Sequence, residues 1–321
     1  MHHKADMTRW QGRVDATEGD LGKRWHQIVT PLEDAPQPGG VALIGFACDA
    51  GVARNNGRTG ARQGPAALRA VLGNMPVRRC HLIADAGDIV PVGDGDDDGL
   101  ERAQGELAAT VAGVLSRGKL PVAMGGGHEI AFGSFSGLAR HLAVKEKAPR
   151  IGVINLDAHF DLRMADRASS GTPFRQIAED CQARGWPFHY CVLGISEFAN
   201  TQALFERAHA LGVRWMLDEE MHVAALDKVR ATLAEFMSQV DHVYFTVCLD
   251  VLPATIAPGV SAPAPRGVPL EVVEPVVDMI AGSGKLRLAD FAELNPSHDV
   301  DQHTARVAAR LLARVVEKSN A

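Results

Sequence analysis

The sequence has 321 residues, of which 46% are hydrophobic and 22% charged, and its formal net charge is −6. These values are typical of a globular protein with one large or two small domains, and no basic run suggests a nucleic-acid partner. Five scattered cysteines without a CxxC pair argue against a disulfide framework. With no signal-peptide pattern and no apolar stretch of 18 residues, we expect a cytoplasmic protein without a membrane partner.

Apolar runs rich in β-branched residues alternate with amphipathic segments of helical period along the chain. We expect strands at 41–46, 81–84, 120–124, 151–156, 189–195, 213–217, 243–249 and 286–292. We expect helices at 100–115, 202–211, 224–236, 268–280 and 304–316. This alternation predicts an α/β fold with a parallel sheet covered on both faces. A single domain is expected over residues 1–321, in which residues 1–38 form an extension that wraps the surface.

An acidic segment, Asp94–Gly99, matches the first half of an EF-hand calcium loop. Gly105 stands where such a loop needs an acidic residue at its twelfth position, and the segment follows a predicted strand rather than a helix. We therefore expect a solvated acidic loop that caps the next helix.

Side chains that bind metals follow three of the predicted strands. These side chains are His128, Asp157, His159, Asp161, Cys248 and Asp250. Residues at positions i, i+2 and i+4 of an extended segment point to the same side, and open α/β sheets bind ligands at the carboxyl ends of their strands. The segment Pro253–Pro269, rich in proline and glycine, is expected to be a loop of the same site.

Two histidines and several carboxylates suit Mn²⁺ or a similar divalent ion, and they exceed the number of ligands that one ion needs. Two ions about 3.5–4 Å apart would hold a bridging hydroxide that is ready to attack a substrate. Any one of these residues alone is more typical of a helix cap or a hydrogen-bonded core residue. Their occurrence at three strand ends favours the metal site.

Several segments, in order along the chain, resemble the signatures of the arginase/agmatinase ureohydrolase superfamily. They are Gly125–Glu129, Asp157–Asp161, Leu249–Pro253 and Ala292–Pro296. Within the superfamily, further segments most resemble the formimidoylglutamase family: Asn55–Ala61, Gly259–Pro263, Trp10 with Gly12 and Arg13, and Arg24–Gln27. The resemblance implies a three-layer α/β/α fold with a central eight-stranded, mainly parallel sheet. It also implies hydrolysis of N-formimidoyl-L-glutamate to L-glutamate and formamide in histidine degradation.

The resemblance further implies two manganese ions. His128, Asp157 and Asp161 would hold one ion, and Asp157, His159 and Asp250 would hold the other. Asp157 would therefore bridge the pair.

Two positions depart from the superfamily pattern. Cys248 stands where arginase-like sites have a second bridging aspartate, and a thiolate is softer than Mn²⁺ prefers. Cys248 is either a ligand or a small buried hydrophobic residue. Ser170 stands where arginases place a catalytic histidine, which argues against arginase activity.

The expected substrate carries two carboxylates. Arg163 stands where arginases have an asparagine, and with Arg175 or Arg58 it is expected to clamp these carboxylates bidentately. The remaining residues expected to bind substrate are Ser169, Ser170 and Asn200.

Two carboxylates are expected to take part in catalysis. Glu293 would pair with the amidinium end of the substrate, while Asp161 would take a proton and return it to the leaving nitrogen. Two alternatives remain: hydrolysis of another amidine or guanidine, such as agmatine, guanidinobutyrate or arginine, and a catalytically weak binding protein. Superfamily members commonly form trimers or hexamers, so a homo-oligomer is expected.

Overall fold

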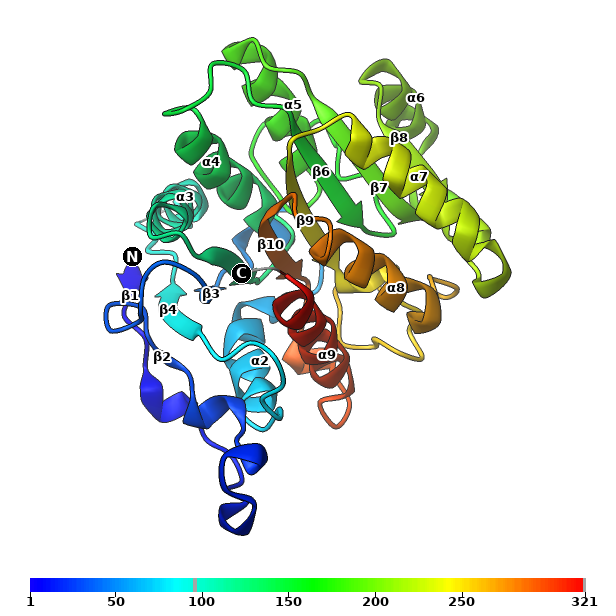
Figure 1. The fold of residues 1–321 in the computed structure, drawn as a ribbon. Coiled ribbons are helices and arrows are strands. Elements are labelled where there is room, and N and C mark those ends of the chain that lie inside the picture. The colour runs from blue at the N-terminus through cyan, green and yellow to red at the C-terminus, as the bar shows by residue number, and fades with distance from the viewer. Residues whose placement is uncertain (95–96, 320–321) are drawn as a thin grey trace.

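A long sheet runs through the protein, with helices on both of its faces (Figure 1). The computed structural model describes residues 1–94 and 97–319. Its strands are β1 His2–His3, β2 Thr30–Pro31, β3 Val41–Phe46, β4 Ile83–Ile89, β5 Leu120–Met124, β6 Ile151–Leu156, β7 His189–Ile195, β8 Arg214–Leu217, β9 His242–Cys248 and β10 Leu286–Ala292. Its α-helices are α1 Ala50–Arg54, α2 Gly64–Leu72, α3 Leu100–Ser116, α4 Ile130–Leu142, α5 Pro173–Arg184, α6 Gln202–Ala210, α7 Leu226–Ser238, α8 Leu270–Ala281 and α9 His303–Lys318. None of these helices combines the length and apolar character needed to cross a membrane.

The described sheet has ten strands rather than the expected eight, because the two-residue strands β1 and β2 both pair with β4. The other eight are parallel and lie in the order β4-β3-β5-β10-β9-β6-β7-β8. Their side chains alternate between two cores. In β3, Val41 and Leu43 belong to the core against α2, α7, α8 and α9, whereas Ala42 and Ile44 belong to the core against α3, α4, α5 and α6. Strands buried on both faces are typical of parallel sheets. The expected three-layer α/β/α arrangement is therefore confirmed.

The strand β4 departs most from its predicted position. The apolar run predicts it at 81–84, but it spans Ile83–Ile89 and includes two acidic residues, Asp85 and Asp88. The guanidinium of Arg69, on α2, pairs with both carboxylates, at 2.8 Å from Asp85 and 2.6 Å from Asp88. This buried ion pair makes acidic side chains compatible with the strand.

Residues 1–38 lie along the β4 edge of the sheet (Figure 1). β1 pairs antiparallel and β2 pairs parallel with β4. Trp25 is fully buried, and the indole N–H of the buried Trp10 donates to the carboxylate of Asp85 at 2.7 Å. These contacts attach the N-terminal segment to the sheet.

The acidic segment expected to cap a helix lies partly outside the described residues, because 95 and 96 are not among them. Asp98 accepts a hydrogen bond from the backbone N–H of Leu100, the first residue of α3, at 3.2 Å. Arg54 pairs with Asp98 and with Glu101, each at 2.6 Å. The negative charges of Asp98 and Glu101 are thus partly balanced by the positive charge of Arg54.

Candidate metal centre

Four neighbouring strands, β5, β10, β9 and β6, end level with one another. Phe291 of β10 is the register partner of Met124 on β5 and of Val247 on β9. Val247 is in turn the register partner of Leu156 on β6. The loops that follow these strands therefore meet at one edge of the sheet, as expected for parallel strands. The polar side chains brought together there are His128, Asp157, His159, Asp161, Cys248, Asp250 and Glu293.

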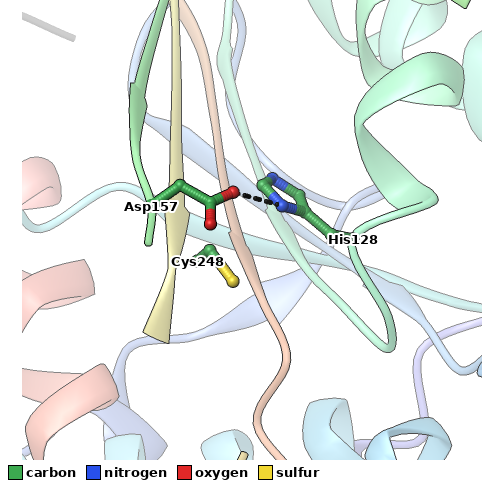
Figure 2. Close-up of side chains that lie close together, drawn as sticks. All are labelled: His128, Asp157 and Cys248. Carbon is green, nitrogen blue, oxygen red and sulfur yellow. Dashed lines mark ion pairs between the residues drawn. The ribbon is translucent and has the colours of Figure 1, made fainter. Parts of the chain in front are cut away.

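The first group of candidate ligands is centred on His128. Its Nδ1 lies 2.9 Å from Oδ2 of Asp157 and 3.0 Å from Oδ2 of Asp161. Figure 2 shows the imidazole turned toward the Asp157 carboxylate, with the Cys248 side chain next to them. One ligand atom each of His128, Asp157 and Cys248 lie within 4.8 Å of one another, close enough to share an ion.

The second group is centred on His159. Its Nδ1 lies 3.2 Å from Oδ2 of Asp250 and 3.5 Å from Oδ1 of Asp157. The three residues again offer ligand atoms within 4.8 Å of one another. Asp157 belongs to both groups, so its two oxygens face two adjacent positions for an ion.

These donors fit a pair of divalent cations. Nδ1 of His128 is buried and has no aligned hydrogen-bond partner among the described residues, although two carboxylates approach it. Asp157 and Asp250 are also buried, and their charges would repel each other without a cation. Imidazole and carboxylate suit Mn²⁺, whereas the Cys248 thiol is the one softer donor of these groups.

Burial and neighbouring charges shift the protonation of the first group when no ion is bound. Burial, together with the charge of Asp157, raises the pKa of Asp161 to about 6. Burial also opposes ionisation of Asp157, but the adjacent His128 outweighs it and lowers the pKa of that carboxyl. Burial opposes protonation of His128, but Asp157 outweighs it and raises the imidazole pKa. The group therefore holds a proton where an ion would bind.

The carboxyl of Glu293 lies on the other side of His128. Its Oε1 accepts a hydrogen bond from the backbone N–H of His128 at 3.0 Å, while its buried Oε2 has no partner among the described residues. Burial and then the charge of Glu129 raise the pKa of Glu293 to about 8. Burial also raises the pKa of the Cys248 thiol, and a bound cation would oppose both shifts.

A cavity of about 290 Å³ opens above these groups. Of the predicted site residues, those that line it are Arg58, His128, His159, Asp161, Arg163, Ser170, Cys248, Asp250 and Glu293. Asp157 lies beneath it and is fully buried. The cavity thus joins most of the predicted metal-binding residues to two of the predicted arginines.

The two arginines that line the cavity differ in their contacts. Nε of Arg58 donates to the carbonyl of Ser261 at 3.0 Å, and its Nη2 donates to the carbonyl of Val260. Arg58 therefore joins two loops. The guanidinium of Arg163 makes no hydrogen bond or ion pair with the described residues, which leaves its donors available to a ligand.

The predicted residues Ser169, Arg175 and Asn200 are not among the described residues that line the cavity. Arg175 donates to the carbonyl of Arg163 at 2.8 Å and pairs with Glu179. Asn200 accepts from the backbone N–H of Phe160 and donates to the carbonyls of Ala158 and Ser196. Ser169 hydrogen-bonds Gly171 and Thr172. In this structure all three hold the loops around the site.

Five residues that line the cavity are not predicted individually as site residues: Asn55, Asn56, Gly57, Ser261 and Ala262. Ser261 and Ala262 belong to the segment Pro253–Pro269, which is expected to be a loop of the site, whereas the first three belong to a segment named only for its family resemblance. Asn55 donates its amide to the Ser170 hydroxyl at 3.2 Å. The signal for this loop was the turn-forming pair Asn56-Gly57. The turn signal does not show which strand end such a loop covers.

Backbone strain is concentrated at the cavity. Five described non-glycine residues have a positive φ, and three of them line it: Asn56 at 57°, Asp161 at 49° and Glu293 at 70°. Such conformations cost free energy and persist where the surrounding structure imposes them, often at functional sites. Here they direct the side chains of Asp161 and Glu293 toward the same space.

Comparisons with known proteins agree with this geometry. A family model described as the arginase family matches residues 39–317. A formimidoylglutamase of Ralstonia nicotianae is 62% identical over 319 residues, covering 99% of this chain and 97% of the relative. A crystal structure of Trypanosoma cruzi formiminoglutamase with Mn2+2 has a TM-score of 0.76 at 26% identity, with coverages of 89% and 98%. The crystal structure of formimidoylglutamase from Bacillus subtilis shares the fold, with a TM-score of 0.78 at 24% identity and 90% coverage of both chains.

Proposed function

The chain belongs to the arginase family, and on this premise we propose that it hydrolyses N-formimidoyl-L-glutamate to L-glutamate and formamide. The observation that carries the proposal is one cavity that is lined by residues of both candidate metal groups and by Arg163, whose guanidinium has no partner among the described residues. The substrate has an amidine to be cleaved and two carboxylates to be recognised. The 62% identity with a formimidoylglutamase supports this substrate over a guanidine.

We propose that the metal is manganese, with two ions per chain. His128, Asp157 and Asp161 would hold one ion, and His159, Asp157 and Asp250 the other. The ligand chemistry supports Mn²⁺, as does the presence of Mn2+2 in the crystal structure of the related Trypanosoma cruzi enzyme.

Cys248 is proposed as a further ligand. Its sulfur belongs to the same close group as His128 and Asp157, which supports ligation over a purely apolar role. A thiol at this position would soften the preference for hard ions.

In the proposed reaction, the Lewis acidity that activates water and polarises the substrate would come from the bound ions. Arg163 pairs with a carboxylate of the substrate and fixes its orientation. Glu293 accepts a hydrogen bond from the amidinium and aligns the formimidoyl carbon. As water adds to the formimidoyl carbon, Asp161 takes a proton from that water, and it returns the proton to the nitrogen of glutamate as the C–N bond breaks.

The test is an assay of metal-stripped protein with added Mn²⁺ on N-formimidoyl-L-glutamate, arginine and agmatine in parallel. We expect manganese-dependent release of glutamate from the first and no turnover of the other two. Turnover of a guanidine would contradict the proposed substrate. No turnover of any of the three, with no bound metal, would favour a binding protein on the same fold.

Three broader features are also proposed. The five cysteines are free thiols, which supports a reducing compartment such as the cytoplasm. We propose one catalytic domain over residues 1–321, with residues 1–38 as its extension. Family resemblance supports a homo-oligomer, which sedimentation of the purified protein would test.

A further inference from the structure

A row of buried polar side chains crosses the sheet just before the strand ends. Asn155, Thr246 and Asp290 are register partners on β6, β9 and β10, and all three are fully buried. They face the helix layer that includes α4, as their strand neighbours Tyr244 and Leu288 do. Buried polar groups cost free energy unless they are hydrogen-bonded. The row therefore needs a physical explanation.

Two members of this row touch candidate metal ligands. The amide of Asn155 donates to Oδ2 of Asp157 at 3.0 Å. Oγ1 of Thr246 lies 3.1 Å from Nε2 of His128, the nitrogen on the far side of the ring from Asp157.

Asp290, the register partner of Thr246, accepts a hydrogen bond from the phenol of Tyr244 at 2.6 Å through Oδ2. The buried Oδ1 of Asp290 has no aligned partner among the described residues, and the hydroxyls of Ser134 and Thr246 both lie near this carboxylate. Oδ1 is therefore an available acceptor for the hydroxyl of Thr246.

The direction of this chain of contacts follows from what each group can donate. Burial raises the pKa of Asp290, while hydrogen bonds from the hydroxyls of Ser134, Thr246 and Tyr244 oppose that shift and favour the ionised form. An ionised carboxylate only accepts, so in that form the single hydrogen of the Thr246 hydroxyl points toward Asp290.

The Thr246 oxygen must then accept from Nε2–H of His128. An imidazole that carries its proton on Nε2 leaves the Nδ1 lone pair free, and Nδ1 faces Asp157 and Asp161.

We propose that Thr246 and Asp290 are positioning residues that fix the tautomer and orientation of His128, so that Nδ1 is offered to the metal ion. This inference rests on the metal centre of the proposed function. Groups that hydrogen-bond the second nitrogen of a metal-binding histidine typically change metal affinity 10- to 100-fold when they are replaced. Neither residue lines the cavity among the described residues, so the effect acts through His128.

The first test compares Thr246→Val with Thr246→Ser. Valine preserves the shape of threonine but cannot accept from Nε2–H, whereas serine keeps the hydroxyl. The measurement is the dissociation constant of Mn²⁺ on metal-stripped protein, by titration calorimetry. We expect Thr246→Val to bind Mn²⁺ about 10- to 100-fold more weakly and Thr246→Ser to bind it as the wild type does.

The second test is Asp290→Asn. Asparagine has nearly the shape of aspartate, but its amide can reverse the direction of the hydrogen bonds from His128 through Thr246 to residue 290. The new amide can donate to the Thr246 oxygen, so the hydroxyl can donate to Nε2 and favour the tautomer with its proton on Nδ1. We expect weaker Mn²⁺ binding in a protein that folds normally. A purely structural role would instead lower the unfolding temperature of the metal-free protein and leave Mn²⁺ affinity unchanged.

Thr304→Val is the matched control. Thr304 is fully buried, and its hydroxyl accepts from the backbone N–H of Gly259 at 2.8 Å without touching a candidate ligand. Its replacement should lower stability and leave Mn²⁺ affinity unchanged. If Thr246→Val fails to fold, Asp290→Asn decides the question.

The two proposals fail in different ways. A wild-type protein that does not bind Mn²⁺ would overturn the metal centre, and this inference with it. A wild-type protein that binds Mn²⁺ while Thr246→Val and Asp290→Asn bind equally well would overturn this inference alone.

Discussion

At the scale of single residues, the contacts of an arginine distinguish recognition from support. Arg58 and Arg163 both line the cavity, but two nitrogens of the Arg58 guanidinium, Nε and Nη2, already donate to the carbonyls of Ser261 and Val260. Arg175 supports the backbone of Arg163 by a hydrogen bond to its carbonyl. Arg163 is thus the stronger candidate for binding a substrate carboxylate.

Replacing Arg163 by alanine should weaken substrate binding. Hydrogen bonds to charged groups contribute about 1.5–3 kcal/mol, so we expect KM for N-formimidoyl-L-glutamate to rise about 10- to 100-fold. The rise should be smaller for an analogue that lacks one carboxylate. Steady-state kinetics on both compounds would measure it.

Arg167→Ala is the control for Arg163→Ala. Arg167 is half-exposed, lies near Arg163 in the chain and pairs with Asp98 at 3.7 Å rather than lining the cavity. The KM of the Arg167→Ala variant for N-formimidoyl-L-glutamate should stay at the wild-type value. Equal KM values for the two variants would remove Arg163 from the substrate site.

At the scale of elements, the loop after β5 positions His128 by continuing the hydrogen bonding of the sheet. The backbone N–H of Gly126 donates to the carbonyl of Phe46, at the end of β3, at 2.8 Å. Its carbonyl accepts from the backbone N–H of Glu293, after β10, also at 2.8 Å. A Cβ at position 126 would overlap the carbonyl oxygen of Cys48. The close approach of these backbones is therefore possible only with glycine.

The substitution Gly126→Ala should push the loop away from β3. Overpacking of this kind costs about 1–3 kcal/mol, and the displacement should also move His128 and weaken Mn²⁺ binding. Urea unfolding and calorimetric titration of Mn²⁺ would measure the two effects.

Gly105→Ala is the control for Gly126→Ala, and we expect it to raise stability rather than lower it. Gly105 is an exposed residue in the interior of α3, and a Cβ there meets nothing within 4 Å. Alanine should therefore stabilise the helix by about 0.5–1 kcal/mol. Destabilisation by Gly105→Ala, or none by Gly126→Ala, would contradict this account of the loop.

At the scale of the whole molecule, the N-terminal segment is attached to the sheet through a buried charge. Asp85 accepts from the indole of Trp10 at 2.7 Å and from two guanidinium nitrogens of Arg69 at 2.8 and 2.9 Å. None of these residues is among the described residues that line the candidate active-site cavity. The attachment should therefore affect stability more than catalysis.

Trp10→Phe removes the N–H donor while keeping an aromatic ring. We expect the loss of one hydrogen bond to a buried carboxylate to lower the free energy of unfolding by about 1.5–3 kcal/mol. KM and Mn²⁺ affinity should stay unchanged. Arg9→Ala, which removes a half-exposed partner of Asp88, should cost less than about 1 kcal/mol. Similar losses for both variants would contradict a specific role of the buried contact.

The sequence by itself determined the features that depend on local chemistry. The apolar runs at 41–46, 120–124, 151–156, 189–195 and 286–292 are strands of the structure with the same bounds. Burial on both faces of a parallel strand leaves a continuous apolar run, which is visible without any neighbour. The polar residues that end these runs indicated the edge at which the candidate metal groups gather.

Only the tertiary structure decided which partner each polar side chain meets. Asp85 lies within β4 because Arg69 pairs with it, and no local pattern shows this pairing. Arg58 joins two loops, and Thr246 contacts His128, across 203 and 118 residues of sequence respectively. Hydrogen bonds depend on distances between segments that are remote in the chain. The apolar period that predicts a strand carries no information about them.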